Sequence, residues 1–365
     1  MAQAILAQGG TAAPLLAVPG PAAMLARASS LDGQQSWMRP RRRRGWLRHR
    51  TRGDDAGSVL HNLLLAKALA SSVGMTYVGS WPGRSLDLAI HFGLPEPSMW
   101  LQVAEVALFN SAADFRATVE SRIRSGQGHG VGRNVTYFIN DIDIHTDLDA
   151  STEGVSRLFS PQLRQELRGL AQLPAPTLWH PRSPLRVAVH VRRGCGFSEA
   201  PMGGCGYDTV FAGHGDVWVQ RLQPNAYYLE VMKLIRDYEP RAEFVVFGPS
   251  LFGDFLKGYR SEDFRRAGAI LRVGGSVWEA MLHLAQSDVL VMSRSSFSYV
   301  PAVYARGVVI YSRFWHHPLS HWLVSNGTVA GLRGASFAEE LSVQLNALGG
   351  RANVETPRVL GSLQK

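Results

Sequence analysis

The segment Arg186–Gly194, with the sequence RVAVHVRRG, places basic residues at the end of a predicted strand. Because side chains alternate along a strand, His190 and Arg192 share one face and the valines share the other. Open α/β sheets bind ligands at the carboxyl ends of their strands, and an arginine fork suits a diphosphate. Gly194 then lets backbone amides approach a phosphate. The segment predicts a diphosphate site, with a basic strand end as the alternative.

The segment Asp288–Tyr299, with the sequence DVLVMSRSSFSY, runs from a predicted buried strand into serines at the start of a predicted helix. These are Ser293, Ser295 and Ser296. Hydroxyls and free amides at a helix N-terminus form an anion site. Ordinary helix capping is the alternative, and it needs only one of the serines.

The two motifs together, H-x-R-R-G after a strand and S-S-F-S at a later strand–helix turn, resemble those of the GDP-fucose-dependent fucosyltransferases. That group includes the α1,2-, the α1,6- and the protein O-fucosyltransferases. The stretch RLQPNAYY at 221–228 is similar to the segment between the motifs, and GSVLHN at 57–62 to a glycine-rich first loop and helix. The resemblance covers roughly residues 53–325. It implies an α/β fold with two Rossmann-like domains of the glycosyltransferase B type, parallel sheets covered by helices, and a donor bound mainly by the second domain.

The resemblance also implies roles for individual residues. Arg192, with His190 beside it, matches the catalytic arginine that holds the donor diphosphate. Substrate-binding residues are expected in both motifs and on the first helix: Arg193, Gly194, Ser295, Ser296, Ser298, Gly57, His61 and Asn62. The expected reaction is metal-independent, inverting transfer of fucose from GDP-fucose to a glycan or glycoprotein hydroxyl. The nucleotide sugar is a co-substrate, and no cofactor is expected. Candidates for the general base are Asp55, Glu199 and Asp208.

Two positions depart from the family pattern. Cys195 follows R-R-G, where many members carry an acid. The acid expected near the nucleobase is absent from 247–250, and Asp254 is the nearest candidate. A non-catalytic carbohydrate-binding relative is therefore one alternative function.

A second alternative comes from the acidic run NDIDIHTDLD at 140–149, which contains D-x-D twice. If the run is extended, one side presents a set of oxygen and nitrogen ligands suited to a hard cation: Asp141, Asp143, Asp147, Asp149 and His145. Transferases of another fold use D-x-D to bind Mn²⁺ or Mg²⁺ with a different nucleotide sugar. A solvated acidic edge or loop is the competing interpretation.

Two groups of histidines could also face a ligand. His61, on the first predicted helix, either faces the donor or lies on the helix surface. The sequence Trp315–Pro318 (WHHP), with His321, either lines the cleft or forms an aromatic surface loop.

Hydrophobic periodicity predicts the elements that must position these residues. Strands are expected at 75–80, 135–140, 186–191, 243–248, 269–273, 288–292 and 307–311. Helices are expected at 57–72, 112–124, 161–172, 225–238, 276–286, 296–305 and 336–347. The prolines between 173 and 185 predict a linker. The expected domains are 53–175 on the acceptor side and 176–350 for the nucleotide sugar, followed by a tail at 351–365.

Charge places a further limit on function. The net charge of +9 arises largely from eight arginines between Arg39 and Arg52, and the rest of the chain is near neutral. Nucleic acid is therefore not an expected partner. Residues 1–52 are expected to form a disordered or targeting basic extension, with order beginning near Asp54. Two cysteines are too few for a disulfide framework. No membrane-spanning segment is expected. The compartment stays open: the Golgi or secretory lumen for an enzyme that modifies glycoproteins, otherwise the cytoplasm.

Overall fold

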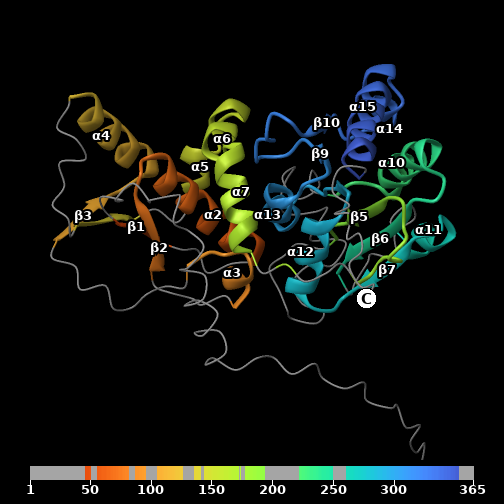
Figure 1. Ribbon diagram of the computed structural model, residues 1–365, viewed down its shortest axis with the longest axis horizontal. Coiled ribbons are helices and arrows are strands. Elements are labelled where there is room, and N and C mark those ends of the chain that lie inside the picture. Colours follow the sequence, from red (N-terminus) through yellow and green to blue (C-terminus); the bar gives the residue numbers. More distant parts are fainter. Residues whose placement is uncertain are drawn as a thin grey trace, which may run out of the picture. The chain divides into compact units, whose positions relative to one another are not determined.

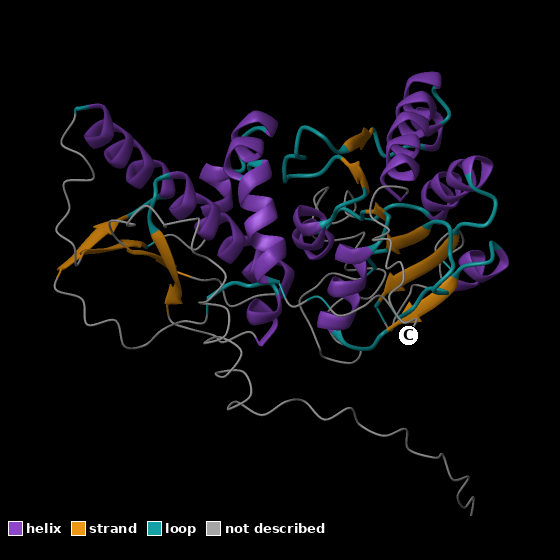
Figure 2. Ribbon diagram, in the orientation of Figure 1, coloured by secondary structure: helices purple, strands orange, loops and turns teal. Residues whose placement is uncertain are grey.

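The computed structural model describes residues 46–50, 56–81, 87–95, 105–125, 135–140, 144–171, 173, 177–193, 222–249 and 260–352. They all belong to one unit that runs from Arg44 to Lys365. Two parallel β-sheets, drawn in orange in Figure 2, lie among helices. The α/β class with two parallel sheets covered by helices is therefore confirmed.

The first sheet has the strand order β2-β1-β4-β3. Its strands are β1 (Trp46–Arg50), β2 (Thr76–Trp81), β3 (Glu105–Phe109) and β4 (Val135–Ile139). The prediction that order begins near Asp54 is wrong, because β1 lies inside the arginine-rich stretch. Leu47 is fully buried and pairs with Tyr77 on one side and Tyr137 on the other. Burial of the Leu47 side chain therefore favours a strand here, although the residues around it are basic.

The helices of the first half begin with α2 (Ala56–Ser72), which is buried along almost its whole length. The others are α3 (Asp87–His91), α4 (Ala112–Arg124), α5 (Ile144–Leu148), α6 (Thr152–Leu158) and α7 (Pro161–Leu170). Ser160 caps α7 by accepting a hydrogen bond from the amide of Leu163, and Pro161 occupies the first helical position, as the sequence predicts.

The second sheet has the strand order β10-β9-β8-β5-β6-β7, and all its pairs are parallel. Its strands are β5 (Arg186–His190), β6 (Glu243–Gly248), β7 (Ile270–Val273), β8 (Val289–Val291), β9 (Val308–Ser312) and β10 (Leu323–Ser325). The first five agree with the ranges predicted from the β-branched runs to within about one residue at each end. Figure 1 shows β5, β6 and β7 side by side.

Helices cover both faces of this sheet. They are α10 (Asn225–Tyr238), α11 (Ser261–Arg266), α12 (Val277–Gln286), α13 (Ser296–Tyr304), α14 (Val329–Leu332) and α15 (Ala335–Ala352). Val187, Val189 and Val191 belong to the core under α10 and α15. Ala188, between them in the sequence, belongs to a second core that also contains residues of α2, α12 and α13. The predicted alternation along β5 is confirmed.

A residue of α7 contacts the C-terminus of helix α13. The guanidinium of Arg168 donates from Nε to the carbonyl of Tyr304 (2.8 Å) and from Nη2 to that of Ala305 (2.7 Å). A cation at a helix C-terminus satisfies free carbonyls and complements the helix dipole. Among the described helices, none is long and apolar enough to cross a membrane.

Candidate functional site

The strand order of the second sheet locates its ligand-binding edge. From β5 the chain continues to β6 and β7 on one side, and it returns to β8, β9 and β10 on the other. In open α/β sheets, ligands bind outside the carboxyl ends of the strands at this point of divergence, here between β5 and β8. At the opposite edge, where the strands begin, the Arg186 guanidinium donates two hydrogen bonds to the Asp288 carboxylate. They run from Nη2 to Oδ1 at 2.7 Å and from Nε to Oδ2 at 2.9 Å. That ion pair fixes the two strands together.

At the carboxyl ends of β5 and β8, four polar side chains form what we name the switch-point cluster: His190, Arg192, Ser293 and Ser295. His190 Nδ1 lies 2.6 Å from Ser293 Oγ. Arg192 Nη1 donates to Ser295 Oγ at 3.1 Å. The same Ser295 hydroxyl accepts from the Phe297 amide and so caps α13. The cluster therefore places a guanidinium at the start of a helix, on the edge where an anionic ligand is expected.

His190 is neutral at physiological pH. Burial, together with the nearby charges of Arg192 and Arg193, lowers its pKa to about 3. In this cluster His190 can exchange hydrogen bonds but does not supply charge, so the cationic role falls to arginine.

The two neighbouring arginines have different surroundings. Arg193 is buried, and its Nη2 donates to Asn225 Oδ1 at 2.6 Å. The Asn225 amide in turn donates to Asp263 Oδ2 at 2.8 Å. This contact links the end of β5 to the start of α10. The stretch around Asn225 thus has a structural explanation, and donor contact by Arg193 stays a prediction.

The remaining predicted residues lie on α2 and α13. Ser298 is fully buried, and its hydroxyl donates to the carbonyls of Ser293 and Ser295, which precede α13. A Cβ on Gly57 would lie 2.7 Å from the Phe297 amide nitrogen, so glycine permits the contact between α2 and α13. Asn62 is buried in α2.

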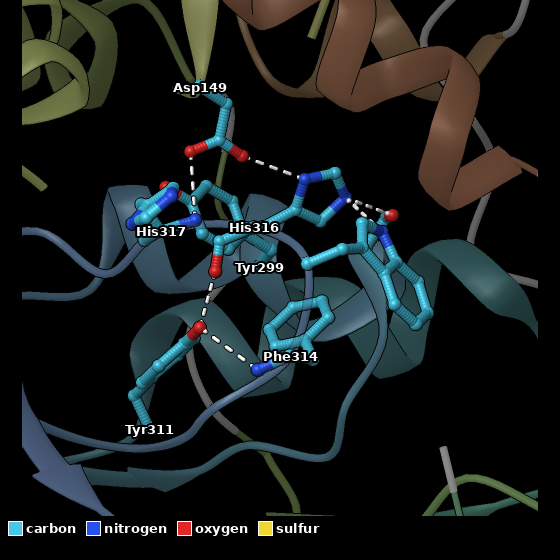
Figure 3. A network of polar contacts seen from close by, with 8 residues as sticks. Asp149, Tyr299, Tyr311, Phe314, His316 and His317 are labelled. Atoms are coloured by element: carbon cyan, nitrogen blue, oxygen red, sulfur yellow. Dashed lines mark hydrogen bonds and ion pairs between the residues drawn. The ribbon is translucent and has the colours of Figure 1, made fainter. Parts of the chain in front are cut away.

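A second polar group, which we name the buried relay, consists of Asp149, His316 and Ser296. Figure 3 shows Asp149 and His316 facing one another. All three are buried. His316 Nδ1 lies 2.7 Å from Asp149 Oδ2, and His316 Nε2 lies 2.8 Å from Ser296 Oγ. The relay therefore connects the end of α5 with the first turn of α13, across a long interval of sequence. The interpretation of WHHP as a surface loop is wrong for His316, whose side chain completes this chain of hydrogen bonds.

The loop that carries His316 is fixed from several sides. Tyr311 donates from its hydroxyl to the His316 carbonyl and accepts from the Phe314 amide (Figure 3). Tyr299 donates to the carbonyl of His317 at 2.7 Å. The amide of His317 donates to Asp149 Oδ1 at 2.8 Å. Both carboxylate oxygens of Asp149 thus accept hydrogen bonds from this loop.

The indole of Trp315 determines the tautomer of His316. An indole N–H can only donate, and Trp315 Nε1 donates to His316 Nε2 at 3.1 Å. Nε2 is therefore the acceptor nitrogen, and in the neutral ring Nδ1 carries the hydrogen that Asp149 accepts. This arrangement leaves Ser296 facing a basic nitrogen.

Burial also shapes the charge of the relay. It raises the pKa of Asp149 to about 7, while the hydrogen bond from the His317 amide opposes the shift. His61, on α2, packs its ring against those of His316 (centroids 4.1 Å apart) and Tyr299 (4.7 Å). Burial holds the pKa of His61 well below its usual range. The expectation of a surface histidine is therefore wrong, and contact between His61 and the donor stays a prediction.

The chemistry of these side chains admits two other interpretations, and the geometry argues against both. His61, Asp149 and His316 each offer one ligand atom within 4.8 Å of the others. Both ring nitrogens of His316 already make hydrogen bonds, so a cation bound by His316 would have to replace one of them. A nucleophilic serine would need free amides as an oxyanion hole, but the Phe297 amide already donates to Ser295 and is covered by Gly57.

The predicted ligand set of the acidic run does not form as a set. Residues 144–148 are helical, not extended, because Ile144 and Leu148, four positions apart, are both buried on one face. Asp147 accepts a hydrogen bond from the Ala113 amide, whereas Asp149 turns to His316. Asp141 and Asp143 lie outside the described residues, as do Gly194, Cys195, Asp254 and the three base candidates Asp55, Glu199 and Asp208.

Sequence reasoning missed a further set of buried polar contacts at the carboxyl ends of β9 and β10. Gln223 Nε2 donates to Ser312 Oγ at 2.8 Å, and the Tyr227 hydroxyl lies 2.7 Å from Ser325 Oγ. Gln223 and Tyr227 belong to the RLQPNAYY stretch, so the polar residues of that stretch are a signal that could have revealed them.

The sequence matches no protein-family model and no curated protein. Solved structures show distant similarity. A variant of FUT1 from Arabidopsis thaliana in complex with GDP is 12% identical, with a TM-score of 0.39, over 77% of this chain and 72% of that chain. The E. coli heptosyltransferase WaaC with ADP-2-deoxy-2-fluoro heptose is 10% identical, with a TM-score of 0.41, over 83% and 99%. The α1,6-fucosyltransferase NodZ soaked with GDP-fucose is 14% identical, with a TM-score of 0.31, over 72% and 92%.

Proposed function

We propose that this chain is a glycosyltransferase of the glycosyltransferase B type that binds a nucleotide sugar at the switch-point cluster. The observation that carries the proposal is the contact between Arg192 and Ser295 at the divergence of β5 and β8. A fixed positive charge beside a helix N-terminus, at that edge of a parallel sheet, suits a diphosphate. The two sequence motifs meet there, although 103 residues separate the two side chains.

The proposed donor is GDP-fucose, on the strength of the H-x-R-R-G and S-S-F-S motifs. The proposed acceptor is a hydroxyl of a glycan or glycoprotein. The acceptor oxygen attacks the anomeric carbon, the bond from that carbon to the diphosphate breaks, and the diphosphate leaves with the electron pair. The configuration inverts, and a general base takes the acceptor proton.

Arg192 stabilises the charge that develops on the leaving diphosphate, so this proposal needs no metal. Neutral His190 contributes hydrogen bonds and keeps Ser293 in place. Of the other proposed donor-binding residues, Gly57, Ser296 and Ser298 lie at the same helix turn, and Arg193 and Gly194 continue the first motif. Electrostatic stabilisation by one such group is worth on the order of 10²–10³ in rate.

The test has two stages. A thermal-shift screen against GDP, UDP, CMP, ADP and their sugars identifies the nucleotide, because a ligand that binds the folded state raises the melting temperature. GDP and GDP-fucose are the expected stabilisers. Donor hydrolysis and transfer to a glycan panel are then measured for the wild type and Arg192→Ala.

Each outcome has a clear meaning. Unchanged turnover by Arg192→Ala contradicts the proposed site. Activity that EDTA abolishes and Mn²⁺ restores favours a metal-dependent transferase instead. Donor binding without turnover on any acceptor indicates a non-catalytic carbohydrate-binding relative, the alternative suggested by Cys195.

A further inference from the structure

The first turn of α13 receives contacts from three directions. On one side Ser295 caps the turn and accepts from Arg192. On another, the backbone of Phe297 packs against Gly57 of α2. On the third, Ser296 meets His316, which is held by Asp149. Two consecutive serines therefore tie one helix turn to two separate polar groups.

We infer that Asp149 and His316 are positioning residues for the donor site, which orient Arg192 through the first turn of α13. The inference rests on the proposed function, and it assigns to a residue of the first half of the chain a role in binding the diphosphate in the second. Neither residue has to touch the donor for this role.

The hydrogen-bond geometry shows how the effect is transmitted. The Ser295 hydroxyl is shared between the Phe297 amide (3.3 Å) and Arg192 (3.1 Å). The neighbouring Ser296 hydroxyl is engaged by His316 and so does not compete for the amides of the turn. Serine is a strong helix cap at either position. If His316 releases Ser296, that hydroxyl can cap the helix one residue later, and Ser295 then loses its orientation toward Arg192.

The tautomer of His316 makes Asp149 essential to this arrangement. With a carboxylate at 149, Nδ1 carries the hydrogen, and the single lone pair of Nε2 is shared between the Ser296 hydroxyl and the Trp315 indole. In Asp149→Asn, the amide can present an N–H to Nδ1, which favours the opposite tautomer. The Nε2 hydrogen then faces the indole N–H of Trp315, donor against donor, and the contact with Ser296 is reorganised.

The experiment measures GDP affinity by calorimetry at a pH above the pKa of Asp149, so that the wild type carries a carboxylate at 149, and well below the melting temperature of each variant. We expect Asp149→Asn to weaken GDP binding about tenfold and Arg192→Ala about a hundredfold. The double variant should match Arg192→Ala within about twofold, because residues that act through one contact are not additive. The matched control is Glu230→Gln, which removes a carboxylate that pairs with Arg333 between α10 and α14. It should bind GDP like the wild type.

A spectroscopic arm separates positioning from mere stabilisation. Histidine-selective NMR of the wild type should show a downfield Nδ1–H signal for His316, which Asp149→Asn abolishes and Glu230→Gln retains. If Asp149→Asn does not fold, His316→Asn releases the Ser296 hydroxyl in the same way and should also weaken GDP binding. Adding Ser296→Ala to that variant removes the competing hydroxyl and should restore GDP binding.

The outcomes distinguish this inference from the proposed function. Losses of affinity that add in the double variant, with wild-type binding intact, overturn the positioning role alone. So does Asp149→Asn binding GDP like the wild type. If the wild type binds none of the nucleotides, the proposed function fails, and the coupling to Arg192 fails with it.

Discussion

The switch-point cluster and the buried relay hold adjacent residues of a single helix turn by different chemistry. In the first, the guanidinium of Arg192 meets the hydroxyl of Ser295 at the edge where a parallel sheet binds ligands. In the second, the buried carboxylate of Asp149 contacts the buried imidazole of His316, and that imidazole contacts the hydroxyl of Ser296. The first group uses a charge that is permanent, and the second uses one whose protonation depends on pH.

The difference teaches that neighbouring residues of one motif can serve separate ends. The two arginines differ in the same way as the two serines. Arg192 contacts Ser295 across the switch-point cluster, whereas Arg193 contacts Asn225 and so holds the start of α10. A motif match alone would give all four residues the same role.

The largest expected effect separates the two arginines. Arg192→Ala should lower transfer about a hundredfold or more while changing stability little. Arg193→Ala should instead destabilise the fold by about 2 to 4 kcal/mol, because it leaves the buried amide of Asn225 without its charged partner. Turnover per folded molecule checks the effect expected for Arg192→Ala, and urea unfolding checks the effect expected for Arg193→Ala. Equal losses of turnover in the two variants would contradict the different roles proposed for the two arginines.

A second effect concerns pH and the relay. The pKa of Asp149 is raised by burial from 3.8 to about 7, so the folded state retains a proton that the unfolded chain has released. The resulting stabilisation is complete below pH 3.8 and is lost as pH rises through about 7. Its size is on the order of 4 kcal/mol, because the two pKa values differ by about three and each pKa unit corresponds to about 1.4 kcal/mol.

The measurement is the free energy of unfolding against pH for the wild type minus that for Asp149→Asn. The difference should fall with rising pH across this window. Other groups that face Asp149 contribute to both curves: His145, His316, His317, Tyr299 and Tyr311. A flat difference would mean that Asp149 is ionised throughout.

A third effect tests the contact between α2 and α13. In Gly57→Ala, the new methyl group would lie 2.7 Å from a backbone nitrogen, so the helices must separate, at a cost of about 1 to 3 kcal/mol. Gly169→Ala in α7 is the matched control, because nothing lies within 4 Å of its added methyl group. It should be neutral or stabilising by up to about 1 kcal/mol. Urea unfolding of both variants decides.

The smallest effect compares two helix caps. Ser295→Ala and Ser160→Ala each remove an N-cap hydroxyl, at a cost of about 1 kcal/mol of stability. Only Ser295→Ala should also weaken GDP binding, because only Ser295 contacts Arg192. If both variants bind GDP alike, Ser295 is a cap and nothing more.

Much of the fold follows from local patterns. The runs RVAVHV and EFVVFG predict β5 and β6 because short β-branched segments between helices suit a parallel sheet. By contrast β1, with the sequence WLRHR, has a single buried leucine among basic residues and no clear period. Its position between β2 and β4 depends on partners that lie far along the chain.

The site residues also fall into two groups, those that a local pattern predicts and those that it does not. His190 and Arg192 are predictable because both follow from one strand and the edge where it ends. The pairing of Asp149 with His316 spans 167 residues, and no local signal marks it. The acidic run predicted an extended ligand set, but the four-residue spacing of Ile144 and Leu148 favours a helix, and burial of that face decides the backbone.

Helix α13 is fixed at both ends by other elements: Arg168 of α7 engages its last carbonyls, and Gly57 and His316 hold its first turn. Such a helix has little freedom to fray. Its amide hydrogens should therefore exchange with solvent mainly through openings that also separate α2 and α7 from it, so that the three helices report a common exchange free energy. The first turn of α13 would then be among the slowest-exchanging parts of the protein, although it lies at the end of a short helix.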